Sequence, residues 1–360
     1  MIRRIILVTP AFAGRDGISA VARQLASALP PLGTERSLEV WALADSERPA
    51  GLDKNIVFRC ASGRRIGFAS LTLRSAASLH ATLVLVTHVH LLPVVLPLQW
   101  RGARVAPILM GIEAWKPLRP LEARALRHAW RVLAISRHTI ERFKAANPSL
   151  ADLAIAVCHP AVPTRTPERQ DRIGGRYALI VGRMSREERY KGHDLLIDVW
   201  PLVQERVPDA TLVIVGGGDD RERLQQRVAD AGLDCAIRFT GAIDDATLAA
   251  HYRDAVLFVM PSRDEGFGLV FLEAMRAGTP CIAATGAAEE IVRDDVDGMV
   301  VEYGDAGALV RAIVRLFTDQ TGRDAMGRAG QARVADAFTA PHFAERLHRV
   351  LQLEIVPVAC

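Results

Sequence analysis

Short apolar segments alternate with longer amphipathic segments along almost the whole chain. Each apolar segment ends near a glycine, a proline or a histidine, and helical periodicity follows it, which is typical of strand–helix units that build a parallel sheet. The strand-like segments are 4–9, 38–43, 83–88, 105–110, 131–135 and 154–158 in the first half, and 177–182, 211–216, 237–240, 256–260, 280–284 and 299–301 in the second. Because a dozen strands would make an unusually large single sheet, we expect an α/β fold with two doubly wound parallel-sheet domains.

A proline- and glycine-containing segment, 159–176, separates the two sets of strands and has no hydrophobic period, so it is expected to be a linker. We therefore expect a first domain over 1–163 and a second over 164–341. A last amphipathic helix, 342–353, is expected to pack back on the first domain. Doubly wound domains bind ligands beyond the carboxyl ends of their strands, so we expect the two domains to face each other across a cleft.

The formal net charge of +4 conceals an asymmetry between the two halves. Residues 1–165 contain 22 Lys and Arg against 10 Asp and Glu, a net of +12, and the remaining residues contain 23 against 31, a net of −8. This asymmetry suggests that the first half faces an anionic partner. A general preference for arginine over lysine is the alternative explanation.

The chain lacks the sequence marks of a membrane-spanning or disulfide-stabilised protein. No stretch reaches the ~18 consecutive apolar residues that a membrane span needs, and residues 1–8 lead into a strand pattern without a signal-peptide cleavage site. The five cysteines are scattered, without a Cys-x-x-Cys pair, which favours neither a disulfide framework nor a zinc site. We expect a cytoplasmic protein without a metal site.

The most informative motif is PSRDEGFGLVFLEAM at 261–275, where a strand pattern ends in a glycine-containing turn and a helical pattern begins near Phe267. The start of a helix has unpaired backbone N–H groups and a partial positive charge, so it favours an anion. Glu265 and Glu273 would be repelled by a bound phosphate unless they bind hydroxyl groups, which a sugar and a ribose supply. The alternative roles are a helix-start carboxylate for Glu265 and a surface glutamate for Glu273.

A second motif, GRMSREERYKGHD at 182–194, places Arg183 directly after a strand and Lys191 before a helix. A guanidinium and an ammonium group so placed can neutralise a departing diphosphate. Lys191 is one of only four lysines in the chain, which favours a specific role. We expect the remaining loop arginines to pair with the loop glutamates on the surface; these residues are Arg186, Arg189, Glu187 and Glu188.

These motifs resemble the retaining GT-B glycosyltransferases of the large family four. Their pattern S-x-x-E-G-F-G-L-x-x-L-E-A-M-x-x-G-x-P is reproduced at Ser262, Glu265, Gly266, Phe267, Gly268, Leu269, Leu272, Glu273, Ala274, Met275, Gly278 and Pro280. Further matches are Gly182-Arg183, Lys191-Gly192, 214–218 and 238–241 in the second half, with looser ones at 10–18, 87–90, 111–115 and 133–136 in the first. The resemblance spans nearly the whole chain and implies two Rossmann-like domains.

The resemblance implies that the second domain binds a nucleoside diphosphate sugar. Arg183 and Lys191 would bind the diphosphate, and they are the expected catalytic residues together with Glu265. The resemblance also implies that the backbone of Gly266, Phe267, Gly268 and Leu269 contacts the phosphates and the sugar, and that Glu273 binds the ribose. The main chain at Arg238 would contact the base, and Gly17 in the loop 14–18 would contact the diphosphate. Such enzymes use Arg, Lys and a helix start where others use a metal, so no metal and no cofactor is expected.

Two departures from the family pattern concern the reacting centre. The spacing between Arg183 and Lys191 is about two residues longer than usual, as in a subset with a similar ERYKGHD insertion. The histidine of the family's H-G-x-E motif is replaced by Met110, whose thioether cannot replace its hydrogen bonding. His88 and His90 are candidates to compensate, although a structural role is the simpler alternative for either one. The acceptor-side residues implied by the first-half matches are His88, Glu113 and Ser136.

The basic segment 115–144 contains ten Lys, Arg and His residues beside two Glu, together with Trp115 and Trp130. Basic residues with interleaved aromatics fit an anionic membrane surface or a polyprenyl-diphosphate acceptor. Nucleic acid is not expected as a partner, because no nucleic-acid-binding module is recognisable. We therefore expect peripheral association with the inner face of the membrane.

The sequence as a whole predicts transfer of a hexose from a UDP- or GDP-linked sugar to a hydroxyl acceptor, with retention at the anomeric carbon. The expected acceptor is a lipid-linked or polysaccharide intermediate of bacterial cell-surface glycan synthesis. Two alternatives stay open. One is a nucleotide-sugar epimerase, which acts on the donor alone, and the other is a GT-B relative that binds the donor without transferring it.

Overall fold

Contacts between elements divide the chain into two units. Unit 1 comprises residues 1–161 and 340–360, and unit 2 comprises residues 162–339, so the divisions fall two residues before the boundaries expected from the sequence. The computed structural model describes residues 2–29, 37–75, 81–163 and 173–353. The centre of the expected linker, 164–172, lies outside the described residues.

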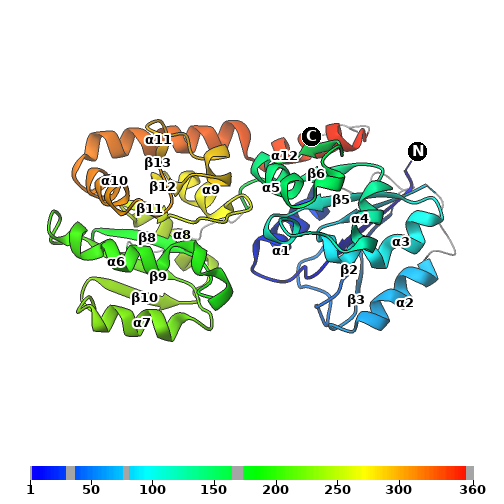
Figure 1. The fold of residues 1–360 in the computed structure, drawn as a ribbon, viewed down its shortest axis with the longest axis horizontal. Helices are drawn as coiled ribbons and strands as arrows, with labels where there is room; N and C mark the ends of the chain where they lie inside the picture. Colours follow the sequence, from blue (N-terminus) through cyan, green and yellow to red (C-terminus); the bar gives the residue numbers. More distant parts are fainter. Residues whose placement is uncertain (1, 30–36, 76–80, 164–172, 354–360) are drawn as a thin grey trace. The chain divides into compact units, whose positions relative to one another are not determined.

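Unit 1 contains a seven-stranded parallel sheet in the order β3-β2-β1-β4-β5-β6-β7 (Figure 1). The strands are β1 (Arg4–Thr9), β2 (Ser37–Ala42), β3 (Val57–Cys60), β4 (Thr82–Val86), β5 (Arg104–Leu109), β6 (Val132–Ala134) and β7 (Ile155–Val157). Six of them coincide with predicted segments. The prediction missed β3, an edge strand whose residues are alternately exposed and partly buried and which therefore lacks a continuous apolar run.

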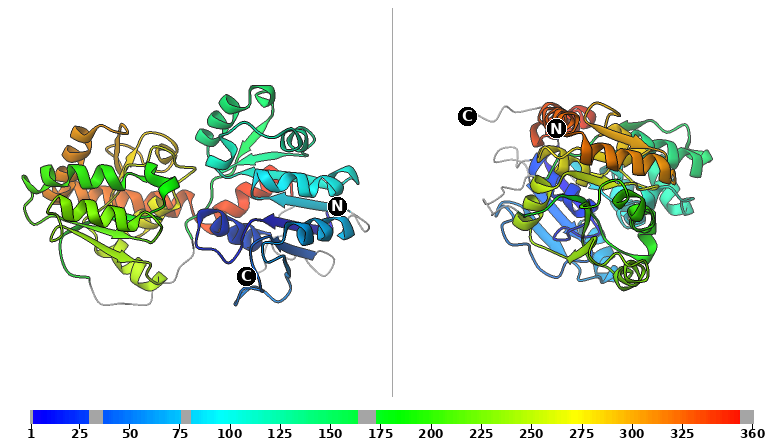
Figure 2. Two further views of the ribbon diagram at one scale, coloured as in Figure 1. Left: turned by 60° about the horizontal axis from the view of Figure 1, so that its bottom comes forward. Right: turned by 90° about the vertical axis from the view of Figure 1, so that its left-hand side faces the viewer.

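The helices of unit 1 form two groups around its sheet. They are α1 (Gly17–Ala28), α2 (Arg65–Ser75), α3 (Leu92–Trp100), α4 (Pro120–Arg127), α5 (Arg137–Ala146) and α12 (Ala340–Leu351). Helices α2, α3 and α4 pack side by side, whereas α12 packs along α1 (Figures 1 and 2). Phe343, Leu347 and Leu351 of α12 are buried, and His348 Nε2 lies 2.9 Å from the carbonyl oxygen of Ala28. The last helix is thus part of the core of unit 1.

Unit 2 contains a six-stranded parallel sheet in the order β10-β9-β8-β11-β12-β13. The strands are β8 (Tyr177–Val181), β9 (Thr211–Val215), β10 (Ile237–Gly241), β11 (Leu257–Met260), β12 (Cys281–Ala284) and β13 (Gly298–Val301). The helices are α6 (His193–Gln204), α7 (Arg221–Asp230), α8 (Asp245–Asp254), α9 (Leu269–Arg276), α10 (Ala306–Thr318) and α11 (Gln320–Ala337). Helix α6 packs against α7 and α10, and α9 packs against α8 and α11. All six predicted strands of this half are present.

The strand order of unit 2 reverses between β8 and β11, which are paired in parallel. In doubly wound sheets, ligands bind beyond the carboxyl ends of the strands at such a switch point. The loops that follow β8 and β11 are the two charged motifs of the sequence. The topology therefore brings together two motifs that lie about 80 residues apart in the sequence.

Among the described residues, the structure has no helix with the length and apolar character needed to cross a membrane.

Candidate donor site

The loops after β8 (182–192) and after β11 (261–268) are in direct contact. The backbone N–H of Arg263 donates to the carbonyl oxygen of Tyr190 over 2.9 Å. Gly192 has a φ of +89°, and a Cβ placed on it would lie 2.7 Å from a backbone oxygen of the second loop. A side chain at this position would force the two loops apart.

The first loop also lies against the glycine turn that follows β9. A Cβ on Gly216 would lie 2.0 Å from the carbonyl oxygen of Gly182, and one on Gly218 would lie 1.9 Å from that of Met184. Both glycines have positive φ, +139° and +147°, so the close approach and the backbone conformation both require glycine. The backbone N–H of Met184 donates to the carbonyl oxygen of Gly217 over 2.8 Å, which fixes the loop there.

Arg183 and Lys191 converge on one carboxylate, that of Glu188. Lys191 Nζ lies 3.0 Å from Glu188 Oε2, and Arg183 donates to both oxygens of the same group, with Nε 3.2 Å from Oε2. The Arg183 side chain is 59% exposed, whereas those of Lys191 and Glu188 are 17% and 16% exposed. Partial burial alone would raise the pKa of Glu188, but Arg183 and Lys191 outweigh it and hold the pKa below its usual range.

The other charges of this loop are paired differently from the sequence prediction. Arg189 makes a two-pronged ion pair with Asp220, at 2.7 and 2.9 Å, and Arg186 lies 4.0 Å from Asp219. The prediction that Arg186 and Arg189 pair with Glu187 and Glu188 is therefore wrong. The physical reason is that the loop folds over the start of α7, which supplies the buried Asp220 to Arg189 and the exposed Asp219 to Arg186.

Asp220 is the centre of this anchoring network. Its almost fully buried carboxylate accepts from Arg189 and from Arg223, and Arg223 also forms an ion pair with Asp194 at 2.7 Å. The hydrogen bond from Arg223 contributes most to holding the pKa of Asp220 far below its usual range, and Arg189 adds to this effect. The network ties the loop after β8 to the starts of α6 and α7.

His193, the first residue of α6, is buried directly behind the loop. A Cβ on Gly182 would lie 3.7 Å from its ring Cε1, and its Nε2 has no hydrogen-bond partner among the described residues. Burial, together with a smaller contribution from the nearby Lys191, lowers the pKa of His193 to about 4. The ring is therefore neutral at neutral pH. The sequence prediction assigned His193 no role.

Glu265 lies in the second loop, partly buried beside Lys191. The backbone N–H of Gly266 donates to Glu265 Oε1 over 3.2 Å. Burial raises the pKa of Glu265, and Lys191 together with the N–H groups of Gly266 and Phe267 opposes this rise. Two of the three predicted catalytic side chains, Lys191 and Glu265, thus interact electrostatically, and Arg183 joins them through Glu188.

Helix α9 begins directly after this loop. Gly268 precedes it with a φ of +98°, and no side chain caps the helix. A Cβ on Gly268 would lie 2.6 Å from the Phe271 ring, so the turn into the helix requires glycine. Leu269 is the first helical residue, and the Phe267 ring is buried against Phe338, with ring centroids 6.2 Å apart. The side chain of Phe267 therefore packs inward and leaves only its backbone for the loop surface.

Glu273 is buried near the middle of α9, and its Oε2 accepts a hydrogen bond of 2.9 Å from the Tyr252 hydroxyl. The surface-glutamate alternative for Glu273 is therefore wrong, because only 6% of the residue is exposed. Arg238 does not lie with this group. It pairs in register with Val213, in the middle of β9, and Gly241 is the β10 residue level with the end of β9.

The three acceptor-side candidates lie at the carboxyl ends of three neighbouring strands of unit 1, β4, β5 and β6. His88 Nδ1 accepts from the backbone N–H of His90 over 3.2 Å, and burial lowers its pKa to about 4. Ser136 is fully buried and caps α5, accepting from the backbone N–H of Thr139 over 3.0 Å. The Ser136 hydroxyl therefore has a structural role in the fold.

Glu113 stands in the turn after β5, beside the position where the family pattern has histidine. Its Oε1 accepts from the backbone N–H of Met110 over 2.7 Å, and burial raises the pKa of Glu113 to about 7. Met110 itself is buried, with 7% of its surface exposed. Gly17, the first residue of α1, is exposed, and the preceding Asp16 caps that helix by accepting from Ser19 N–H over 3.0 Å.

Residues 175–319 match the family model described as "Glycosyl transferases group 1". This range contains both contacting loops, the glycine turn and helix α9. The second unit is a glycosyl transferases group 1 domain. Its sheet order, with the switch point between β8 and β11, places the charged loops of the group 1 domain where doubly wound folds bind ligands.

Relatives of the chain share more than the group 1 domain. The chain is 35% identical over 249 residues to a GDP-mannose-dependent alpha-(1-6)-phosphatidylinositol monomannoside mannosyltransferase of Mycolicibacterium smegmatis, covering 63% of this chain and 64% of that protein. The protein of the same name from Mycobacterium tuberculosis is 35% identical over 216 residues, covering 56% of each chain. The chain therefore matches less than two-thirds of the length of these relatives.

Solved structures resemble the whole chain. Sucrose-phosphate synthase from Thermosynechococcus elongatus superposes with a TM-score of 0.76 at 21% identity, covering 97% of this chain and 98% of that one. The lipopolysaccharide outer core galactosyltransferase WaaB superposes with a TM-score of 0.73 at 16% identity, covering 98% and 100%. The predicted GT-B fold, with its two parallel-sheet α/β domains, is confirmed.

The described residues contain no group of three or more His, Cys, Asp or Glu side chains arranged to hold a metal ion. One Asp-x-Asp triplet, Asp295–Asp297, lies in the turn before β13 of the group 1 domain. Asp297 is fully buried and ion-paired with Arg293 at 2.6 Å, and Asp295 pairs with Arg315 at 2.6 Å. These carboxylates hold the turn together through arginines.

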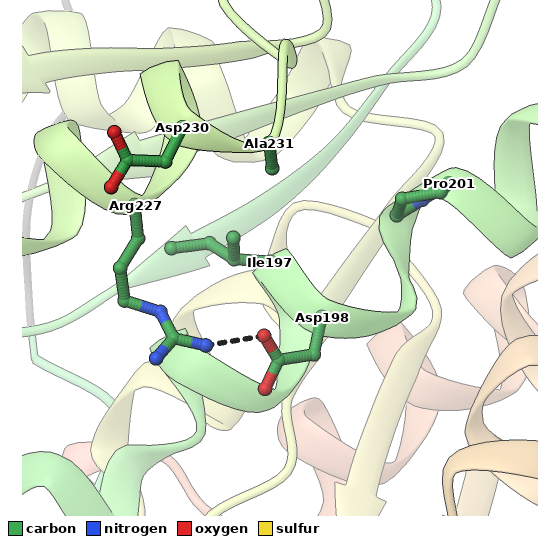
Figure 3. A pocket seen from close by; sticks show the side chains of 6 residues that line it. All are labelled: Ile197, Asp198, Pro201, Arg227, Asp230 and Ala231. Atoms are coloured by element: carbon green, nitrogen blue, oxygen red, sulfur yellow. Dashed lines mark hydrogen bonds and ion pairs between the residues drawn. The ribbon is translucent and has the colours of Figure 1, made fainter.

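A surface hollow of the group 1 domain lies between α6 and α7 (Figure 3). It has a volume of about 350 Å³ and is lined by Ile197, Asp198, Pro201, Arg227, Asp230 and Ala231. Arg227 and Asp198 form an ion pair beside it. None of these residues belongs to the predicted donor site.

Proposed function

We propose that the chain is a retaining glycosyltransferase that transfers a hexose from a nucleoside diphosphate sugar to a hydroxyl acceptor. The observation that carries this proposal is the convergence of Arg183, Lys191 and Glu265 where the two loops of a group 1 domain meet. Two cations and a carboxylate at a switch point suit a ligand that combines a diphosphate with sugar hydroxyls.

In this proposal, Arg183 and Lys191 act on the leaving group. The bond between the anomeric carbon and the diphosphate oxygen breaks, and its electron pair stays on the diphosphate. The acceptor oxygen bonds to the anomeric carbon on the same face, and its proton passes to the departing phosphate oxygen. Fixed positive charge placed where negative charge develops lowers the barrier without reorganisation at the moment of reaction. The reaction as proposed needs no metal and no cofactor.

The carboxylates and the helix start position the donor. Glu265 accepts hydrogen bonds from the donor sugar hydroxyls, and the backbone from Gly266 to Leu269 meets the phosphates at the start of α9. Glu273 is proposed to bind the ribose. Its present partner, the Tyr252 hydroxyl, fixes the orientation of the carboxylate within the helix.

GDP-mannose is the first donor to test, and a UDP-hexose is the second. Support for GDP-mannose comes from the mannosyltransferases that are 35% identical to this chain and whose names specify that donor. The same names specify a phosphatidylinositol mannoside, so a lipid-linked acceptor is proposed for this chain, with a polysaccharide intermediate of cell-surface glycan synthesis as the other form.

We propose that unit 1 meets this acceptor at the inner face of an anionic membrane. The aromatic residues of the basic segment 115–144 do not project freely, because Arg142 stacks on Trp115 and Arg131 on Trp130. Helices α2, α3 and α4 instead expose large apolar side chains near arginines. The exposed apolar residues are Ile66, Leu73, Trp100 and Leu121, and exposed arginines on or beside these helices are Arg64, Arg65, Arg74, Arg101 and Arg124. Apolar and cationic side chains together favour an anionic lipid surface.

The test is a transfer assay with GDP-[³H]mannose or UDP-[³H]glucose and vesicles that contain phosphatidylinositol lipids. The proposal predicts label in the lipid fraction, an α-linked product from the α-linked donor by NMR, and unchanged activity with EDTA. A donor altered without any acceptor would indicate an epimerase instead. Donor binding without nucleotide release would indicate a relative that has lost transfer.

A further inference from the structure

Among the described residues, Glu188 pairs with both of the cations proposed to hold the donor diphosphate. Its two oxygens accept from Arg183 and Lys191, so a single carboxylate satisfies a guanidinium and an ammonium group together. A phosphate oxygen needs the same donors in the same positions. The carboxylate and the diphosphate therefore compete for one pair of cations.

The loop that carries Glu188 is held in place on both sides of it. Ser185 caps the short 3-10 helix η5 (Arg186–Lys191), and Arg189 is locked to Asp220 by its two-pronged ion pair. Glu188 lies at a kink within η5, with φ −116° and ψ 25°. The residues on either side of Glu188 in the sequence are therefore fixed, and the hydrogen-bond and ion-pair partners of its carboxylate among the described residues are the two cations.

We propose that Glu188 is an exchangeable counter-ion that occupies the cations Arg183 and Lys191 until the donor diphosphate displaces it. The proposal rests on the proposed function, because it assigns the diphosphate to those cations.

The exchange has opposite consequences for binding and for release. A diphosphate carries more negative charge than one carboxylate, so it prevails at the cations when present, but its net affinity is reduced by the ion pairs it must break. After transfer, the return of Glu188 favours release of the nucleoside diphosphate. Glu188 thus limits product inhibition at the expense of donor affinity.

The opposite role, in which Glu188 positions Arg183 and Lys191 for the diphosphate, predicts the reverse effects. Glu188→Gln keeps the size and shape of the side chain but removes the competing charge. If Glu188 is displaced, the variant binds nucleoside diphosphates more tightly; if Glu188 is a positioning residue, the variant binds them less tightly. The sign of the change separates the two roles.

The experiment is calorimetric titration of the full chain with GDP and with UDP. For E188Q we expect a dissociation constant for the preferred nucleotide about 3- to 10-fold lower than wild type, from the loss of two partly exposed ion pairs. In the transfer assay, we expect E188Q to show a lower donor KM and stronger inhibition by the nucleotide product. Glu187→Gln is the matched control: it removes the same charge from the neighbouring, exposed position and should match wild type.

The possible results distinguish this inference from the function on which it rests. If wild type binds a nucleotide and E188Q binds it equally tightly or less tightly, the counter-ion role alone is overturned. Failure of wild type to bind either nucleotide overturns the proposed function and this inference together. Thermal unfolding of E188Q and of Glu188→Ala checks folding, and both folded variants must bind more tightly than wild type for the inference to stand.

Discussion

At the scale of single residues, Arg183 and Lys191 of the group 1 domain lie in the loop after β8, where its sheet reverses order. Lys191 is the most enclosed cation there, close to both Glu188 and Glu265. The sequence indicated a specific role for Lys191, because lysine is rare in this arginine-rich chain and Lys191 lies just before a helix. Its partner Glu188 was not identified, because pairing within the loop depends on which carboxylates α7 supplies to the other arginines.

Lys191→Ala removes the ammonium group proposed to stabilise the leaving diphosphate. We expect the transfer rate at saturating donor to fall at least ~100-fold, the range seen when one preorganised transition-state contact is removed. Lys54→Ala, at an exposed position of unit 1, is the control and should keep wild-type turnover. A Lys191→Ala protein with an unchanged far-UV spectrum and near-native turnover would remove Lys191 from the mechanism.

His193 makes the stability of the domain depend on pH. Its pKa is lowered to about 4, whereas an unfolded histidine titrates near pH 6.5, so the unfolded chain binds more protons between these values. The contribution of the neutral ring is complete above pH 6.5 and is lost as the pH falls towards 4. From pH 7 to pH 5 this amounts to about 2 kcal/mol.

Urea unfolding at pH 7 and pH 5 measures this contribution. The free energy of unfolding should fall from pH 7 to pH 5 in wild type. In His193→Gln this fall should be about 2 kcal/mol smaller. Replacement of His128, exposed after α4, should leave the wild-type difference in place. Equal pH dependence in wild type and His193→Gln would show that the ring is not buried in its neutral form.

At the scale of elements, the strands and helices of the group 1 domain follow from hydrophobic periodicity, but the contacts between its loops do not. The β8 and β11 segments were predictable because buried parallel strands are continuous apolar runs. The approach of the β8 loop to the glycine turn after β9 depends on backbone atoms more than 30 residues apart. Periodicity carries no information on such an approach, and only the glycines indicate it.

Two adjacent glycines of that turn provide a matched test. A Cβ on Gly218 would lie 1.9 Å from the carbonyl oxygen of Met184 at a φ of +147°, whereas a Cβ on Gly217 meets nothing within 4 Å. Gly218→Ala should lower the free energy of unfolding by about 1–3 kcal/mol or more and weaken nucleotide binding by displacing the loop. Gly217→Ala should unfold like wild type. Equal denaturation midpoints for the two variants would contradict the close approach.

At the scale of the whole molecule, the sequence predicted two doubly wound domains, which the structure and its neighbours confirm. The alternation of strand and helix segments determines that architecture. Edge strand β3 was not predicted, because it is half exposed. The roles of the site residues stay predictions. They depend on how a ligand replaces the interactions of Arg183, Lys191 and Glu273, which a sequence pattern does not describe.

The place of α12 in unit 1 leads to a prediction about local stability. Leu347 is fully buried in α12, which packs on α1. Leu347→Ala should lower the stability of unit 1 by about 2–5 kcal/mol. Hydrogen exchange should then show faster exchange in α1 and β1 and unchanged protection in β8 and β9. Leu202→Ala, 45% exposed on α6, should change neither unit measurably, and faster exchange confined to unit 2 in Leu347→Ala would contradict the assignment of α12.

The most direct test of the central claim is calorimetric titration of wild type and Arg183→Ala with GDP-mannose and with UDP-glucose. We expect one of these donors to bind wild type at one molecule per chain. We also expect at least ~10-fold weaker binding to Arg183→Ala, since a charge-assisted contact to the diphosphate is lost. Failure of both donors to bind wild type, or equal binding by Arg183→Ala, would contradict a donor site at Arg183.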